Sequence, residues 1–346
     1  MSVVMDPATG DAQSGSSERP GIAWLPRISC AIVRSGTSRI VVLRDEDLPD
    51  YHTRGRVILD LLANNISTDG VGGSHYQSNK VAVVGRGTDG SDFTFHFYQV
   101  VPQSRRLLSK MECSNAASAS GVFATLLGLT PLDGGTTMRS INLATKQHVE
   151  LEPVSACWWN GGWNVRFTHL HHLWLHMTKS AVPFDLTHDG QRVTGHIVRH
   201  GNIFVMAQVP RAAVSESLVA ELNGIGAAYG AAHNLPDSMP KVMPYEILDI
   251  ADTDMVCDAA CFSEGQRHHS LPGSGAMALG AFLTAQNRMK LPPDTDAAET
   301  TFRFHHPSGS MTAHIYLSRS PSHWDIVATS FETPVRLLVE GSLILR

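Results

Sequence analysis

Residues 112–124, ECSNAASASGVFA, place a thiol, a hydroxyl and an amide side by side at Cys113, Ser114 and Asn115. Small and apolar residues continue through 115–128, with few large side chains among them. This run predicts a helix, and strands can pack closely around a helix with such small side chains. Ser114 or Asn115 is the expected N-cap, because short polar side chains satisfy the free N–H groups of a first turn.

The N-terminal end of such a helix favours binding of a carboxylate, because it presents free N–H groups and a positive dipole. The same field favours a thiolate over a thiol in a cysteine placed there. A single cysteine is more commonly a buried structural residue. The neighbouring Ser114 and Asn115 favour the functional interpretation of Cys113.

A second segment, 264–286, repeats this arrangement. A polar, glycine-containing turn at 273–275 precedes a run of small residues that predicts a helix over 276–286. The internal repeat suggests two similar halves, each with one central helix whose N-terminus faces a shared cleft.

A glycine-rich loop at 69–80, DGVGGSHYQSNK, comes before the first predicted central helix and ends in Lys80. Its glycines permit positive φ or a close approach of the backbone to a ligand. The loop matches neither a P-loop nor a Rossmann fingerprint. The apolar run 81–84 then predicts a strand, so that a lysine stands at the entrance of a strand. Together with the Cys-Ser-Asn turn, this arrangement indicates a site that moves protons on an anionic substrate.

The remaining elements are mostly strands. Residues 27–43 predict two strands joined by the polar turn 34–39, in which Thr37 and Ser38 either line a carboxylate pocket or belong to an ordinary hairpin. Further helices are expected at 54–64 and 215–232. Further strands are expected at 93–101, at several places in 138–210, and at 241–250, 254–261, 301–318 and 335–345.

The composition restricts the class of protein. The chain has 346 residues, 42% of them hydrophobic and 17% charged, with a net charge of −5. No run of Lys and Arg indicates a nucleic-acid interface, and no apolar window approaches the twenty or so residues of a membrane span. No signal peptide is apparent, and five irregularly spaced cysteines favour reduced thiols, so we expect a cytoplasmic protein. Residues 1–20 have the composition of a disordered tail.

Metal binding is not expected. Cys257 and Cys261 have no second Cys or His pair at zinc-ligand spacing.

Seven short motifs occur in an order that resembles the methylaconitate isomerase (PrpF-like) family, within the diaminopimelate epimerase-like fold. They are Arg34-Ser-Gly-Thr-Ser-Arg39, Asp69-Gly-Val-Gly-Gly73, Ser78-Asn-Lys-Val-Ala82, Cys113-Ser-Asn115, Gly273-Ser-Gly-Ala276, His306-Pro-Ser-Gly309 and Thr333-Pro-Val-Arg-Leu-Leu338. Each motif is weak by itself, but together they cover the chain from about residue 27 to its end.

The resemblance implies an α+β fold of two pseudo-symmetric domains, each a mostly antiparallel β-barrel-like sheet around a central helix. We therefore expect an N-terminal domain at 21–175, joined by the last strand at 333–346, and a C-terminal domain at 176–332. It also implies a cofactor-independent isomerase for an unsaturated di- or tricarboxylate. We expect no bound metal ion, and a homodimer is the oligomer considered.

The family's Ser-x-Lys and Cys-Gly-Asn motifs fall on Lys80 and on Cys113 to Asn115, which makes Lys80 and Cys113 the candidate catalytic residues. The substrate-binding candidates are Thr37, Ser38, Gly72, Gly73, Ser78, Ser114, Asn115, His268, Ser274, Gly275 and His306. The amides at 114–116 and 274–276 are expected to hold carboxylates.

The sequence departs from the family pattern at several positions. Ser35 and Arg39 stand where the family has glycine and lysine, and Ser114 stands where it has glycine. The arginine expected in the second domain is absent, and Ala259 and Ala260 occupy that region. These differences concern the choice of substrate.

The chemistry expected is an allylic 1,3-proton shift, which moves a C=C bond or interconverts cis and trans isomers. A two-cysteine epimerase of the same fold is disfavoured, because Pro272 occupies the place of the second cysteine. A non-catalytic carboxylate-binding protein, or an isomerase recruited to a specialised pathway, are the remaining alternatives.

Overall fold

The computed structural model describes residues 26–62, 70–73, 75–101, 104–130, 136–157, 162–170, 181–235, 239–286, 288, 290–292, 294–321 and 323–344. The tail expected at 1–20, Asp69 and the expected domain boundary at 175/176 lie outside these residues. The positions of the two domain boundaries therefore remain a prediction.

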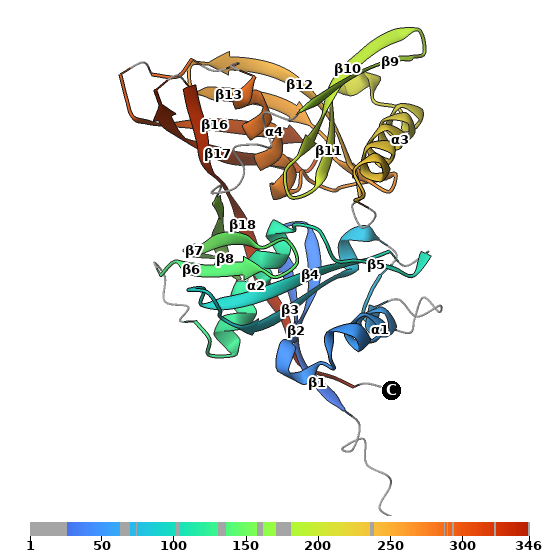
Figure 1. Cartoon of the computed structure of the whole chain (residues 1–346), viewed down its shortest axis with the longest axis vertical. Coiled ribbons are helices and arrows are strands. Elements are labelled where there is room, and N and C mark those ends of the chain that lie inside the picture. The colour runs from blue at the N-terminus through green and yellow to red at the C-terminus, as the bar shows by residue number, and fades with distance from the viewer. Residues whose placement is uncertain are drawn as a thin grey trace, which may run out of the picture.

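The chain forms two halves that lie one above the other in Figure 1. The first half contains helices α1 (Tyr51–Leu62) and α2 (Ser114–Leu126). Its strands are β1 (Arg27–Ser35), β2 (Ser38–Arg44), β3 (Lys80–Arg86), β4 (Phe93–Val101), β5 (Arg106–Leu108), β6 (Met138–Asn142), β7 (Gln147–Cys157) and β8 (Gly162–Leu170).

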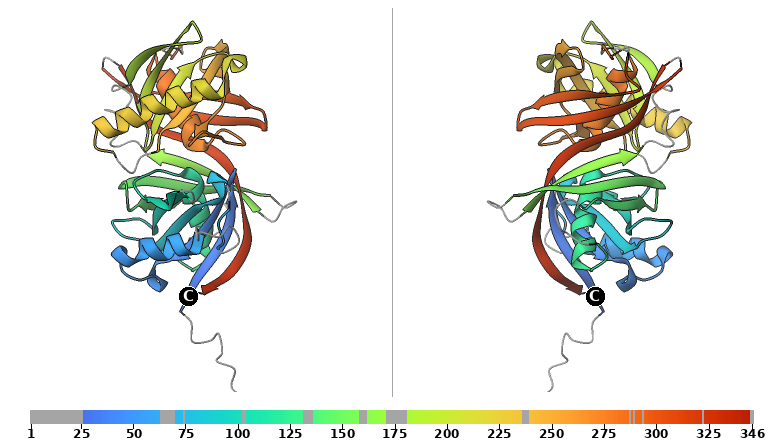
Figure 2. Two further views of the ribbon diagram at one scale, coloured as in Figure 1. Left: turned by 90° about the vertical axis from the view of Figure 1, so that its right-hand side faces the viewer. Right: turned by 90° about the vertical axis from the view of Figure 1, so that its left-hand side faces the viewer.

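The second half contains helices α3 (Glu216–Ala232) and α4 (Gly273–Ala285). Its strands are β9 (Val182–His188), β10 (Gln191–Arg199), β11 (Ile203–Gln208), β12 (Lys241–Ala251), β13 (Asp254–Ala259), β14 (Phe262–Ser263), β15 (Gln266–Arg267), β16 (Ala297–His306) and β17 (Gly309–Ser320). The last strand, β18 (His323–Ile344), runs along both halves, as the two side views in Figure 2 show.

In the first half the strand pairings close into a ring. The ring passes through β1, β2, β3, β4, β6, β7, β8 and β18, and β18 returns to β1. Most pairs are antiparallel, but β2–β3 and β4–β6 are parallel. The second half repeats this pattern with the parallel pairs β11–β12 and β13–β16. The predicted fold, two pseudo-symmetric and mostly antiparallel sheets around central helices, is confirmed.

The strand register is the same at equivalent positions of the two halves. Lys80 pairs with Ile40, which is two residues after Ser38, and Lys241 pairs with Phe204, which is two residues after Asn202. Lys80 and Lys241 are therefore the first residues of the equivalent strands β3 and β12. Strand β3 runs parallel to β2, and β12 runs parallel to β11.

The central helices are almost completely buried. Residues 114–124 of α2 and 273–284 of α4 are all buried. Phenylalanines from β4 surround α2, and phenylalanines from β16 surround α4. Small residues are required here, because a Cβ added at Gly121 would lie 2.8 Å from the Leu151 side chain. The sequence prediction of small helices enclosed by strands is confirmed for both.

The predicted elements differ from the observed ones mainly at their ends. The last strand begins at His323 rather than at 335, because its first part pairs with β17 before it reaches β8 and β1. Helix α4 begins at Gly273 rather than at 276. Within the described residues, no helix is long and apolar enough to cross a membrane. The expected cytoplasmic location and the homodimer remain predictions.

The packing around α4 gives a test of this architecture. A Cβ at Gly273 would lie 2.0 Å from the Phe331 ring, so Gly273→Ala is expected to lower the free energy of unfolding by about 1–3 kcal/mol. Gly224→Ala in α3 is the matched control. Since no atom lies within 4 Å of its added methyl group, it should stabilise the protein by about 0.5–1 kcal/mol. Urea unfolding of both variants measures the difference, and equal stabilities would contradict the packing.

Candidate functional site

The first predicted catalytic residue, Lys80, lies at the start of β3 with only 6% of its surface exposed. Its Nζ donates a hydrogen bond to Ser38 Oγ at 2.9 Å and lies 3.6 Å from Cys113 Sγ. The Tyr76 ring, 5.6 Å from Nζ, covers the ammonium group. These contacts join a lysine and a cysteine that are 33 residues apart in the sequence.

The β1–β2 turn completes this cluster. Asn115 Nδ2 donates to the same Ser38 Oγ at 3.1 Å, so that Ser38 links the lysine to the first turn of α2. Gly36 makes the approach possible: its φ is +52°, and a Cβ there would lie 2.9 Å from Asn115 Oδ1. Thr37, between Gly36 and Ser38, is partly exposed.

Helix α2 begins earlier than a Ser114 or Asn115 cap would require. Its N-cap is Cys113, without a capping bond from the side chain, and Ser114 is already helical. The expectation of Ser114 or Asn115 as N-cap is therefore wrong, since Asn115 uses its side chain on Ser38 instead. Among the described residues, the N–H groups of 114–116 have no acceptor, and the first N–H bonded to the Cys113 carbonyl belongs to Ala117. These free donors follow Cys113 directly in the chain.

Hydrogen bonds fix the glycine-rich loop that leads into Lys80. Arg39 Nη2 donates to the Gly72 carbonyl at 3.0 Å, and Gly73 N donates to Asn79 Oδ1 at 3.0 Å. A Cβ at Gly72 would lie 2.2 Å from the Leu62 carbonyl. Arg39, one of the departures from the family pattern, thus holds the loop in place. Ser78 lies in the 3-10 turn that immediately precedes Asn79 and Lys80.

A second buried lysine, which the sequence analysis missed, lies in the other half. Lys241, 5% exposed, donates from Nζ to Ser274 Oγ at 3.3 Å, and Ser274 is in the first turn of α4. Burial lowers the pKa of Lys241, and the Lys80 charge lowers it further against the opposing effect of Cys261. A signal for Lys241 was present, since Lys-Val at 80–81 recurs at 241–242, each time at the start of an apolar strand.

The two halves differ at the helix entrance. Pro272 is the N-cap of α4, in the place that Cys113 has in α2. Gly275 N and Ala276 N both donate to the Pro272 carbonyl, at 2.8 and 3.0 Å. The expectation that the amides of 274–276 are free is therefore wrong for Gly275 and Ala276, because both already donate to the Pro272 carbonyl. Gly275 also packs tightly, because a Cβ there would lie 3.0 Å from Met243 Sδ.

The two predicted histidines have different surroundings. His268 is buried beside the Lys80 cluster: its Nε2 lies 2.9 Å from Ser263 Oγ, and its ring packs against Tyr76. Burial, followed by the charge of Lys80, holds the pKa of His268 well below its usual value. A buried, neutral His268 suits a hydrogen-bonding role.

His306 is surrounded by a different set of charges. Burial and then the charges of Arg267 and Arg211 lower its pKa to about 4, and Asp258 opposes them. Within the described part of the chain, His306 bonds to Ser308 and makes no hydrogen bond to Lys80 or Cys113.

Glu112, immediately before Cys113, is a further buried group that the sequence analysis missed. Its carboxylate accepts hydrogen bonds from Asn142 Nδ2 at 3.1 Å and from Thr145 Oγ1. Burial raises its pKa to about 7, against these hydrogen bonds and the charge of Lys241. Its backbone is held from the other half, since Asn202 Nδ2 donates to the Glu112 carbonyl at 3.0 Å. Asn202 corresponds in register to Ser38.

Hydrogen bonds therefore join Ser38, Lys80, Cys113 and Asn115 directly, with Ser114 next in the chain. Ser274 lies at the entrance of the equivalent helix in contact with Lys241, and α2 and α4 touch each other. Gly72, Gly73 and Ser78 shape the loop before Lys80. His306 and Gly275 lie outside the Lys80 cluster. Among the described residues, no group of three or more His, Cys, Asp or Glu could hold a metal ion.

A comparison with protein-family models identifies residues 25–221, more than half of the chain, as a match to the PrpF protein family. The chain belongs to the PrpF family. The matched region contains β1–β11, α2 and the whole Lys80 cluster. The predicted family is confirmed.

Similar sequences include proteins named as isomerases and a tautomerase. The chain is 31% identical to YbhH of Escherichia coli over 128 residues, and 32% identical to 4-oxalomesaconate tautomerase of Pseudomonas putida over 115. It is 32% identical to 3-methylitaconate isomerase of Eubacterium barkeri over 102 residues. The matches cover 28–35% of this chain and 27–37% of these relatives. Each match therefore spans about a third of the length of the relative.

Solved structures match over nearly the whole chain. A methylitaconate-delta-isomerase has a TM-score of 0.60 at 18% identity and covers 92% of this chain and 95% of its own. A hydroxyproline epimerase from Agrobacterium vitis has a TM-score of 0.60 at 12% identity, with coverages of 93% and 94%. At such identities the similarity establishes the two-half fold.

The raised pKa of Glu112 predicts how stability depends on pH. A carboxyl that binds its proton more tightly in the folded state stabilises the fold at low pH, and this contribution is lost as the pH rises from about 4.5 to about 7. Glu112→Gln keeps an acceptor oxygen without the charge. It should therefore be as stable as the parent near pH 4.5 and about 1–3 kcal/mol more stable at pH 8.

Denaturant unfolding at the two pH values measures this difference. Glu150→Gln is the control, since the Glu150 side chain is 29% exposed beside Arg139 and should show no such gain. A Glu112→Gln variant that lost stability at pH 8 would show that the carboxylate is needed there in its charged form.

Proposed function

We propose that this PrpF-family protein is a cofactor-independent isomerase that catalyses an allylic 1,3-proton shift on an unsaturated di- or tricarboxylate, such as an aconitate- or itaconate-like acid. The observation that supports this best is the 3.6 Å contact between Lys80 Nζ and Cys113 Sγ at the free N-terminus of α2. Two groups that can each carry a proton are held there beside unoccupied N–H donors.

The chemistry needs one base and one acid on the same allylic unit. A base removes a proton from the carbon next to the double bond, and the C–H electron pair becomes the new C=C bond. The negative charge passes to the carboxylate as a dienolate, and an acid then protonates the far carbon. Lys80 and Cys113 are assigned to these two transfers, and a proton passing between Nζ and Sγ would restore the starting state.

The dienolate needs stabilisation by fixed positive groups. The amides of 114–116 are aimed away from the helix and are held by the Ser38–Asn115 hydrogen bond. Such preorganised donors stabilise developing charge at little reorganisation cost. Tyr76 and His268 cover the other side of Lys80 and limit access of water to its amine.

Lys241 and Ser274 are assigned to a second carboxylate. This pair replaces, in function, the second-domain arginine that the sequence lacks. Its charge lies close enough to the first cluster for Lys80, Cys113 and Glu112 all to influence the pKa of Lys241. A substrate with a carboxylate at each end of an allylic unit would therefore lie between two cations, Lys80 in the first half and Lys241 in the second. The names of the related 4-oxalomesaconate tautomerase and 3-methylitaconate isomerase are consistent with this class of acid.

The two-cysteine epimerase is less compatible with the geometry. Pro272, at the entrance of α4, has no acid–base group. Cys261, the cysteine whose charge is coupled to Lys241, has no exposed surface, and burial raises its pKa to about 12. A carboxylate-binding protein without activity is the second alternative, and the experiment below separates it from an isomerase.

Lys80→Ala and Cys113→Ala should each lower the rate of proton exchange into itaconate or cis-aconitate by about 100-fold or more, because each removes one proton carrier. Exchange is followed by NMR in deuterated water, with each acid supplied separately. Cys30→Ala and Lys146→Ala are the matched controls, since Cys30 is buried in a different core cluster and Lys146 is exposed. Full activity in both site variants would refute the assignment, and no exchange with any polycarboxylate would favour a binding protein.

Lys241→Met should weaken binding of a dicarboxylate by about tenfold or more, because a charge-assisted hydrogen bond to a carboxylate is lost. Itaconate, with two carboxylates, and crotonate, with one, are compared by calorimetric titration. The affinity for crotonate should change much less, since the α2 amides hold its single carboxylate. Equal losses for both acids would place Lys241 outside the second carboxylate site.

A further inference from the structure

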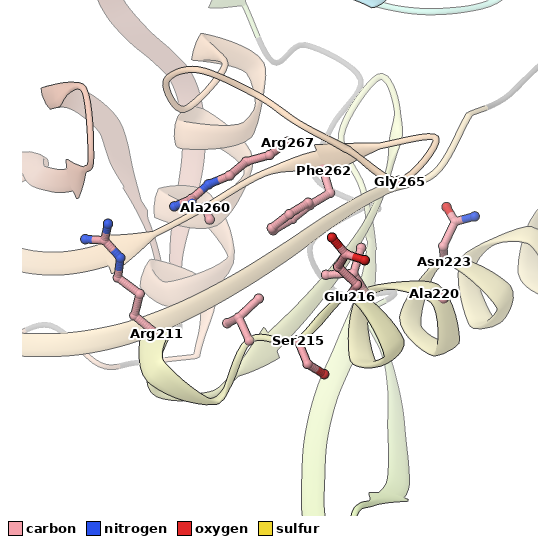
Figure 3. A pocket seen from close by; sticks show the side chains of 11 residues that line it. Arg211, Ser215, Glu216, Ala220, Asn223, Ala260, Phe262, Gly265 and Arg267 are labelled. Atoms are coloured by element: carbon pink, nitrogen blue, oxygen red, sulfur yellow. The ribbon is translucent and has the colours of Figure 1, made fainter.

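A cavity of about 750 Å³ lies in the second half, between α3 and the short β14–β15 hairpin. Figure 3 shows its lining side chains, which include Arg211, Glu216, Asn223, Phe262 and Arg267. None of the thirteen residues predicted for the catalytic site lines it. Its volume is in the range of sites for small organic ligands.

The polar groups are separated along the cavity. At one end the side chains of Arg211 and Arg267 both extend toward the side where Ala260 lies (Figure 3). Arg211 is partly neutralised by Asp258, whose Oδ2 lies 3.4 Å from Nη1. Within the described part of the chain, Arg267 forms no ion pair. The charges of both arginines lower the pKa of His306, after the larger effect of burial.

The middle of the cavity is apolar. The Phe262 ring lies between the arginine end and the Glu216 carboxylate in Figure 3, and Val214, Val219 and Ala220 add aliphatic surface. An anion at the two arginines would therefore have space for an apolar body beside Phe262. Glu216 opposes a second negative charge at the other end.

We infer that this cavity is a second ligand site, which binds a small molecule with one carboxylate or phosphate group on a planar apolar body. The anionic group lies between Arg211 and Arg267, and the apolar body packs against Phe262. Arg–carboxylate and Arg–phosphate pairs are strong and directional, and an aromatic ring packs well on another.

The hairpin that forms the cavity wall also touches the proposed catalytic cluster. Phe262 pairs with Arg267 and Ser263 with Gln266, and side chains of successive residues point to opposite faces of a strand. Phe262 and Arg267 face the cavity. On the other face, Ser263 contacts His268 and Gln266 Oε1 accepts from Tyr76 N at 3.0 Å.

A ligand in the cavity would therefore contact a segment that also holds Tyr76 and His268 beside Lys80. This coupling rests on the proposed function, whereas binding itself does not.

Calorimetric titration with phenyl phosphate tests the site. Inorganic phosphate, without the ring, and benzyl alcohol, without the charge, should bind at least about tenfold more weakly. Arg267→Ala should weaken phenyl phosphate binding at least tenfold, since it removes one of two guanidinium groups. Glu216→Gln should leave binding unchanged or strengthen it, because a repelling carboxylate is lost.

Arg303→Ala is the matched control, because Arg303 is an exposed strand arginine of the same half that does not line the cavity. Lys80→Ala distinguishes the two sites, and should leave phenyl phosphate binding intact. Binding lost in Lys80→Ala but retained in Arg267→Ala would assign the probe to the catalytic cluster and overturn the inference. The inference is also overturned if titration of the parent protein with phenyl phosphate, up to about 10 mM, gives no heat of binding.

Coupling is measured separately. Saturating phenyl phosphate should change the exchange rate of the acid substrate in the parent protein and have no effect in Arg267→Ala. An unchanged rate in the parent would refute the coupling through the hairpin. Activity without phenyl phosphate reports on the proposed function alone, so failure of one can be told from failure of the other.

Discussion

The structure depends on the burial of two small-residue helices inside two sheets. Helix α2 and helix α4 are enclosed along nearly their whole length, so their N-termini open into the protein interior instead of into solvent. The N–H groups of a first turn cannot bond within their own helix and carry a partial positive charge. In the interior these donors strongly favour an anionic partner. The groups that form the site lie around these two helix ends.

The near-symmetry of the two halves explains the division of roles. Each half places a lysine at the start of the strand that runs parallel to its hairpin, Lys80 in one and Lys241 in the other. Each lysine bonds a hydroxyl group near a helix entrance, Ser38 or Ser274. The symmetry is broken at the N-cap, where one helix has Cys113 and the other has Pro272. One half thus has a thiol beside its lysine, whereas the other has a proline at the equivalent position and a hydroxyl group bonded to its lysine.

Three features connect the halves, one strand and two sets of hydrogen bonds. Strand β18 pairs first with β17 and then with β8 and β1, so that it belongs to both sheets. Asn202, in the second half, bonds the backbone of Glu112 directly before Cys113. The cysteine is therefore positioned by both halves. The β14–β15 hairpin does the same for Tyr76 through Gln266.

The sequence by itself determined the architecture and pointed to the Lys80–Cys113 part of the candidate site. Periodicity and small-residue content identified both central helices, because only small side chains fit inside a closed sheet. The motifs around Lys80 and Cys113 were recognisable, because each couples a turn to a strand or helix within a few residues. The tertiary structure alone decided which distant residues meet. Glu112 and Asn202 carry no local motif, and Lys241 has only the short Lys-Val repeat. The contacts of all three depend on burial and on partners 30 to 90 residues away. Arg39 and Asn115 likewise received their roles from packing, since a hydrogen bond depends on where two chain segments come together in space and not on the sequence around either one.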